Sequence, residues 1–160
     1  MTDQRIARQR PLRVKALLLT MQRRGELAVS LTRWAIEELK ALRLLAKGSR
    51  FVVPGKNPDR HADSKLITRS VKRLLPRFVA HGIEAFVPHD LRRSGGTTLG
   101  RLGVSPFVGE RVINHSKGVL EETYDLWDYF DEKREALERL EAYLLQLRDN
   151  ERAGPVAKAK

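Results

Sequence analysis

The feature that most constrains the fold is the spacing of large apolar residues near the end of the sequence. Phe130, Leu137, Leu140, Leu144 and Leu147 follow the three-to-four-residue interval of a single helical face. A half-buried strand would instead alternate apolar and polar residues. The spacing predicts a helix over residues 131–148, and similar patterns elsewhere favour a mainly α fold.

Five more helices are expected, at residues 12–21, 32–46, 65–77, 88–102 and 106–114, and a helical pattern resumes at Leu120. Ser105 followed by Pro106 is typical of a helix start, and Gly48 and Gly103 are typical of helix ends. Asp63 or Ser64 is expected to cap the helix at 65–77. Between the second and third helices, Phe51–Pro54 is predicted to form a short strand and residues 54–63 a loop.

The length favours one domain over residues 1–149, since 160 residues can bury a sizeable single core. Residues 150–160 lack periodicity and are predicted to be a disordered tail. The absence of cysteine excludes disulfides, iron–sulfur clusters and cysteine-ligated zinc, and we expect no metal and no cofactor. No apolar run is long enough for a membrane span, so we expect a cytoplasmic protein that does not bind membranes.

Positive charge is concentrated in the first half of the chain. Residues 1–80 carry 19 basic and 6 acidic side chains, whereas residues 81–160 carry 12 and 14, within a formal net charge of +11. A basic surface attracts polyanions by releasing their counterions, and nucleic acid is the commonest polyanion in cytoplasm. Solvated arginines on helix surfaces would give the same asymmetry. Particular residues must therefore distinguish a nucleic-acid-binding surface from a merely solvated one.

Three features can carry chemistry. His89 and Arg92 are three residues apart at the expected start of a helix, which places both on one face at its positive end, where anions bind. His115 lies on a turn after the helix at 106–114. Tyr124 follows nine residues later, in an acidic segment.

In this order and spacing these residues resemble the catalytic domain of the tyrosine recombinase (phage integrase) family, most closely its prophage and satellite-phage type. Residues 18–26 contain Arg23 and Glu26, like the first Arg-x-x-Glu motif of the family. The resemblance resumes at residues 89–99, with His-x-x-Arg, and at residues 112–116, with Asn-His-Ser. It ends at residues 123–125, around Tyr124.

The resemblance implies site-specific recombination and integration of double-stranded DNA in the bacterial nucleoid. It assigns Tyr124 as the nucleophile that forms a 3′-phosphotyrosyl link, which needs no cofactor because the link stores the bond energy. Arg23 and Arg92 would hold the non-bridging phosphate oxygens, and His115 would be a third donor. His89 would move a proton near the tyrosine hydroxyl.

The sequence departs from the family in two ways. Intact relatives have an α+β catalytic core and two DNA-binding modules before it, whereas here Arg23 lies almost at the start. The β-hairpin that carries a catalytic lysine is also largely missing, because Glu26 runs almost directly into residues 29–34, which resemble the far side of that segment. We therefore expect a truncated integrase that is weakly active or inactive.

Two alternatives stay open. The chain could be a non-catalytic DNA-binding or dominant-negative partner of an intact integrase, or form a homo-oligomer, through the leucines of the helix at 131–148. It could instead be a helix-turn-helix regulator that uses the basic helix at 65–77. Tyr129 and Tyr143 are interpreted as packing residues, and His61 and His81 as structural or exposed.

Overall fold

The computed structural model describes residues 11–12, 14–16, 31–63, 65–113 and 129–153. Within these ranges the chain is mainly helical and contains no strand, which confirms the predicted class. Residues 11–12 and 14–16 are helical. The labelled helices are α2 (Arg33–Leu45), α3 (Leu66–Ala80), α4 (Pro88–Arg101), α5 (Pro106–Val112) and α7 (Phe130–Ala153).

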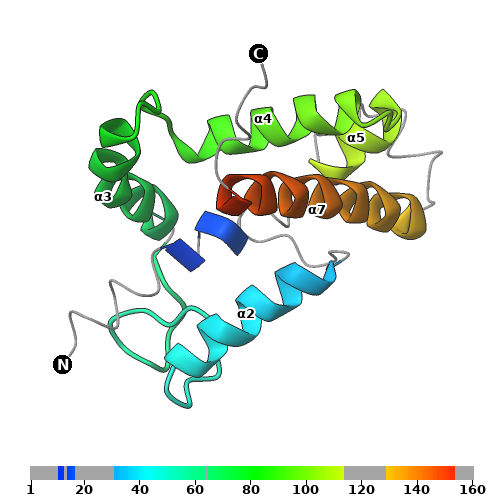
Figure 1. Cartoon of the computed structure of the whole chain (residues 1–160). Helices are drawn as coiled ribbons and strands as arrows, with labels where there is room; N and C mark the ends of the chain where they lie inside the picture. Colours follow the sequence, from blue (N-terminus) through cyan, green and yellow to red (C-terminus); the bar gives the residue numbers. More distant parts are fainter. Residues whose placement is uncertain (1–10, 13, 17–30, 64, 114–128, 154–160) are drawn as a thin grey trace, which may run out of the picture.

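Helices α4, α5 and α7 form the centre of the fold (Figure 1), and α3 contacts α4 beside them. Their shared core is built from buried apolar residues, Leu99, Val112, Ile113, Ala136, Leu137 and Leu140. Leu144 packs against this cluster from the next turn of α7, whereas Leu147 stays 45% exposed. The predicted leucine face of α7 is therefore largely used within the chain.

Local sequence chemistry accounts for the helix starts. Thr32 is extended and its side chain accepts a hydrogen bond from the Ala35 amide at 3.4 Å, and Ser105 accepts one from Val108 at 3.3 Å. These side chains satisfy amides that have no partner inside the helix. The predicted starts at residues 32 and 106 are confirmed.

The N-terminal part of α2 contacts α7. The Trp34 amide donates to Glu141 Oε2 at 2.9 Å, and the Arg148 guanidinium lies 5.3 Å from the centre of the Trp34 ring. The indole N–H of Trp34 donates to Glu38, which also pairs with Lys15 at 3.2 Å. Trp34 is thus an anchor between helices. The Trp34 cluster, made of these five residues, joins α2 to the central helices.

The expected strand at residues 51–54 is wrong. Only an isolated antiparallel bridge joins Pro54 to His61, and the intervening residues form a loop closed by a hydrogen bond from the Gly55 amide to the Arg60 carbonyl at 2.8 Å. A strand needs a partner of comparable length, and the described part of the chain supplies none. Phe51 instead packs edge-on against His61 and under Arg50.

Two helix boundaries also differ from the prediction. Helix α3 continues past residue 77 to Ala80, although Pro76 lies inside it. The expected cap by Asp63 is wrong: Lys65 occupies the N-cap position without a side-chain capping hydrogen bond, and Asp63 accepts the Lys65 amide at 2.8 Å, before the helix begins. Helix α7 continues to Ala153, so residues 150–153, expected in the tail, are its last turn. Ser64 and residues 154–160 lie outside the described residues.

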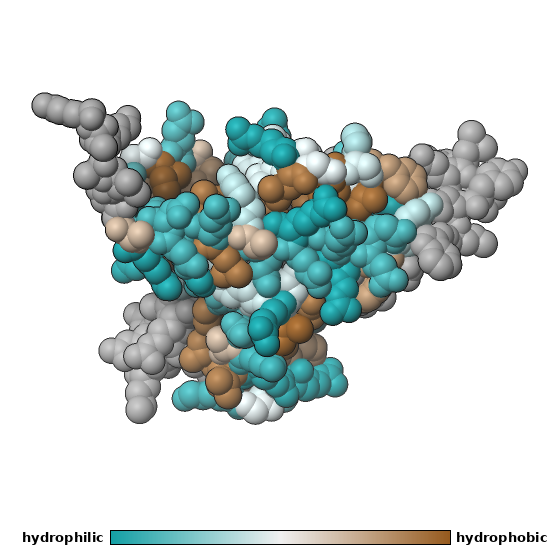
Figure 2. Space-filling view, turned by 45° about the vertical axis from the view of Figure 1, so that its right-hand side comes forward, coloured by the Kyte–Doolittle hydropathy of each residue, from teal (hydrophilic) through white to brown (hydrophobic). Residues whose placement is uncertain are grey.

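The surface of this part of the chain is mixed in character. Figure 2 shows hydrophilic residues over most of one face, with hydrophobic residues gathered in separate patches. None of the helices in the described ranges combines the length and the apolar character that crossing a membrane requires.

Candidate functional site

The candidate site is a cavity of about 500 Å³ between α4 and the start of α5. We call it the α4–α5 groove. One wall comes from α4 and the other from residues 104–106 and α5. Its lining residues are His89, Arg92, Arg93, Gly96, Thr97, Gly100, Val104, Ser105, Pro106, Gly109, Glu110 and Ile113.

The start of α4 is fixed by residues next to the groove. Val87 is extended, Pro88 occupies the first helical position, and the Asp90 carboxylate accepts the Val87 amide at 2.9 Å. Proline suits this position because its fixed φ is helical and its missing N–H would have no partner there. A carboxylate in the first turn also complements the positive end of the helix. His89 is held in this first turn, and it is exposed.

Arg92 occupies the next turn of α4. It is only 6% exposed and belongs to the small set of buried charged residues. A buried guanidinium loses much of its rotamer freedom on folding, so its planar donors keep a fixed direction. His89 and Arg92 therefore line one cavity, the first with an exposed imidazole and the second with a buried side chain.

Glycines keep the groove open. A Cβ atom at Gly100 or Gly109 would meet nothing within 4 Å, and one at Gly96 would reach only ordinary contact with Ile113, at 3.7 Å. The absence of side chains at these positions leaves the space between the two walls. Glu110 contributes the acidic side chain among the lining residues, against the basic His89, Arg92 and Arg93.

The back wall of the groove is the hydrophobic core. Ile113 lines the groove and also belongs to the core cluster with Leu99 and Val112. Leu99 and Val112 are 0% exposed. Because these residues fix α4 against α5, the positions of the groove walls depend on core packing.

An aromatic cluster joins Phe107 and Arg111 of α5 to Tyr129, which directly precedes α7. The rings of Phe107 and Tyr129 meet edge to face with centroids 5.0 Å apart. The Arg111 guanidinium lies 3.3 Å from the first ring centre and 4.5 Å from the second. These ring contacts confirm the interpretation of Tyr129 as a packing residue, and its backbone φ is positive, at 52°.

The structure brings two of the five predicted site residues together. His89 and Arg92 line the same groove, as their spacing on α4 requires, while Arg23, His115 and Tyr124 lie outside the described residues. The expected hairpin deletion, after Glu26, also falls there. Among the other histidines, His61 and His81 are exposed and contact backbone carbonyls, which agrees with their structural interpretation.

Several groove residues were missed from the sequence. Arg93, Gly96 and Gly100 are four, seven and eleven residues after His89, which is the periodicity of one helical face. Once α4 was assigned, this spacing could have identified them. No such spacing identifies Glu110 as a groove residue, because its position depends on how α5 crosses α4.

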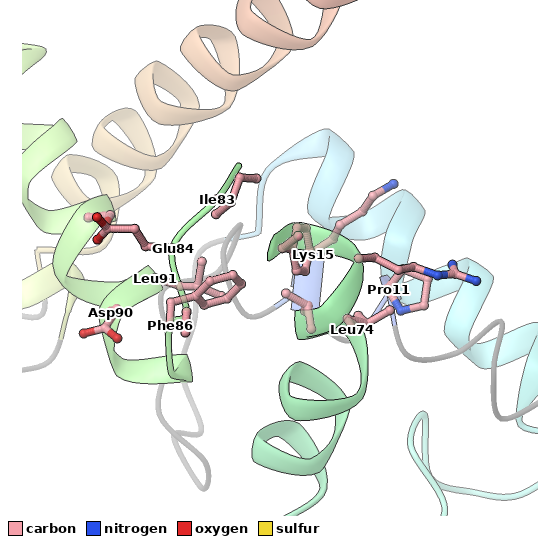
Figure 3. Close-up of a pocket in the computed structure, with 13 residues that line it drawn as sticks. Pro11, Lys15, Leu74, Ile83, Glu84, Phe86, Asp90 and Leu91 are labelled. Carbon is pink, nitrogen blue, oxygen red and sulfur yellow. The ribbon is translucent and has the colours of Figure 1, made fainter. Parts of the chain in front are cut away.

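A larger cavity, of about 930 Å³, lies between α3, α4 and the segment that contributes Pro11, Val14 and Lys15 (Figure 3). Figure 3 shows Phe86 and Leu91 across from Leu74 and Pro11, with Glu84 and Asp90 at one edge. Its walls are mostly apolar, and neither His89 nor Arg92 lines it. Size alone therefore does not make it the better candidate for phosphate chemistry.

No group of three or more histidine, aspartate or glutamate side chains in the described ranges is arranged to hold a metal ion. Comparisons with models of known protein families, with curated proteins and with solved structures found no match to this chain.

Proposed function

We propose that the chain is a remnant of a tyrosine recombinase catalytic domain, and that the α4–α5 groove holds the DNA phosphate at which a strand is broken. The observation that carries the proposal is that His89 and Arg92, the two defined residues of the His-x-x-Arg motif, line one cavity. A fold that used this motif only as surface charge would not need to bury the arginine, and Arg92 is 6% exposed.

The chemistry follows from the side chains. A guanidinium presents planar, paired donors that suit two phosphate oxygens, and its interaction strengthens as negative charge builds up on them in the transition state. The imidazole of His89, one helical turn away, can hold or transfer a proton at a reacting hydroxyl. Together they can bind and polarise a phosphodiester.

The nucleophile in this proposal is Tyr124. Its phenolate oxygen attacks phosphorus, the bond to the 5′-oxygen breaks, and a 3′-phosphotyrosyl link forms while the leaving oxygen takes up a proton. A phenol with a pKa of about 10 needs help to lose its proton at neutral pH, and His89 is the candidate acceptor. Residues 26–34 contain no lysine, so the lysine that would protonate the leaving oxygen in intact relatives has no counterpart there. A missing general acid costs about 10² to 10⁴ in rate, so the proposed activity is slow cleavage without efficient strand exchange.

The test is covalent capture. Nicked duplexes with a randomised centre release a short fragment after cleavage, which traps the phosphotyrosyl link. After incubation and denaturation, only covalent protein–DNA adducts are retained and sequenced. We expect adducts with the wild-type chain, none with Tyr124→Phe, and far fewer with Arg92→Ala, while Tyr129→Phe serves as the matched tyrosine control.

Adducts that persist in Tyr124→Phe, or their complete absence from the wild type, would refute the catalytic proposal. Absence of adducts together with unimpaired DNA binding would favour the non-catalytic DNA-binding partner instead. Docking on another chain through α7 stays a prediction. Two of the leucines proposed for it, Leu137 and Leu140, are buried in this chain's own core.

A further inference from the structure

A second, shallower hollow lies on the outer side of α4. Its volume is about 350 Å³, and its lining is polar: Asp90, Arg93, Ser94, Thr97, Thr98 and Arg101. We call it the outer hollow. At about 100° per residue, the centre of this set lies on the opposite side of the helix from Leu99, which is buried in the core. One helix thus has a core face, a groove face and this outer face.

The side chains of the outer hollow are those that bind phosphate. Arg93 and Arg101 each offer a planar fork of donors, and three hydroxyls, of Ser94, Thr97 and Thr98, lie between them. Backbone phosphates of DNA are commonly contacted by arginines together with serine and threonine hydroxyls. The lining therefore suits an anion with several acceptor oxygens.

The two guanidiniums are available for a ligand. Arg93 and Arg101 are exposed, and in the described ranges neither forms an ion pair with a carboxylate. By contrast, Arg134 and Arg139 on α7 are paired with Glu138 and Glu135, at 3.2 and 2.6 Å.

The acid in the hollow, Asp90, lies at its N-terminal end. Its carboxylate accepts the Val87 amide at 2.9 Å and so is engaged in capping α4. An anion nearer Arg101 is therefore separated from this carboxylate by most of the helix, about 16 Å for eleven residues at 1.5 Å each.

The outer hollow continues directly into the α4–α5 groove, because Arg93 and Thr97 line both. Arg93 and Arg101 are eight residues apart, or about 12 Å along the helix axis. A DNA strand advances about 3.4 Å per phosphate along its axis. The separation of the two arginines therefore spans several phosphates and is longer than the space that one phosphate occupies. We propose that the outer hollow binds two backbone phosphates of duplex DNA, through Arg93 and Arg101, beside the phosphate held in the groove.

This inference rests on the DNA-binding part of the proposed function but not on cleavage. It predicts that each arginine displaces counterions from one phosphate, which contributes about 0.9 to the slope of log affinity against log salt concentration. The strand that enters the groove would continue along the outer face of α4, past Arg93 toward Arg101.

The test measures the affinity of the full chain for a 20-base-pair duplex at about 50 to 200 mM salt, by fluorescence anisotropy. For Arg93→Ala with Arg101→Ala we expect the slope to fall by about 1.8, so that over this fourfold range the wild type loses about 12-fold more affinity than the variant. The matched control, Arg134→Ala with Arg139→Ala, removes the same charge from α7 and is expected to keep the wild-type slope. Arg93→Lys with Arg101→Lys should keep most of the slope, because lysine binds phosphate as a point charge.

Equal slopes for the Arg93/Arg101 and Arg134/Arg139 variants would overturn the inference and leave the groove proposal intact. Failure of the wild type to bind duplex DNA would overturn both. A reduced slope in a chain that forms no Tyr124 adduct would support the outer hollow and refute the proposed cleavage. Circular dichroism checks that the variants are folded, which we expect because both arginines are exposed.

Discussion

Replacing Leu140 by alanine tests whether α7 packs against its own chain, as the groove requires. The Leu140 side chain is 2% exposed and belongs to the core cluster that also holds Leu99 and Leu137. Large-to-small substitutions at such sites cost about 2 to 5 kcal/mol, through lost burial and the cavity that remains. The total stability of a domain is about 5 to 15 kcal/mol, so the loss should be a large fraction of it.

The matched control is Leu147→Ala, two turns further along the same helix, where the side chain is 45% exposed. We expect it to cost about 0.5 kcal/mol or less, as is usual for surface positions. The assay is urea unfolding followed by circular dichroism at several protein concentrations. With a denaturant slope of about 2 kcal/mol per molar, Leu140→Ala should lower the midpoint by about 1 to 2.5 M.

Similar costs for the two substitutions would refute the packing described for α7. A Leu140→Ala effect that disappears at low protein concentration would have the same consequence, because it would indicate that Leu140 is buried only against a second chain. Either result would favour the alternative in which the leucine face of α7 docks on a partner.

Three further substitutions test the local arguments, by thermal and urea unfolding. Ser105→Ala removes the side-chain cap of α5 and should cost about 1 kcal/mol; an unchanged midpoint would mean that the cap is not formed. Gly103→Ala forces a side chain into a φ of 77° and should cost about 1 to 2 kcal/mol. Gly100→Ala, in open space on α4, should instead stabilise by up to about 1 kcal/mol, and equal effects of the two alanines would contradict the difference in backbone conformation.

Features set by neighbouring residues were predictable from the sequence. Ser105 acts on an amide three residues away, so its capping hydrogen bond could be predicted, and the same spacing would have identified Thr32 as a cap. The proximity of His89 and Arg92 also follows from helical spacing alone. These predictions needed no knowledge of how the helices pack.

Features that depend on distant partners were not predictable in this way. Residues 51–54 have the composition of a strand, but strand formation depends on a partner, and only one bridge to His61 forms. The groove opens because α5 crosses α4 beside Gly96, a relation between two helices that no local pattern encodes. The outer hollow was missed because Arg93 and Arg101 lie in the half of the sequence where acidic side chains slightly outnumber basic ones, so the charge distribution did not point to them.

The central claim is that DNA phosphate binds in the α4–α5 groove, and nuclear magnetic resonance tests it most directly. The imidazole signals of His89 and the Nε–H signal of the buried Arg92 can be followed while a nicked duplex is added. The account predicts that both sets of signals shift together, with one dissociation constant. Unchanged signals at both residues, with shifts confined to α3, would contradict it and indicate that DNA is bound by the basic helix alone.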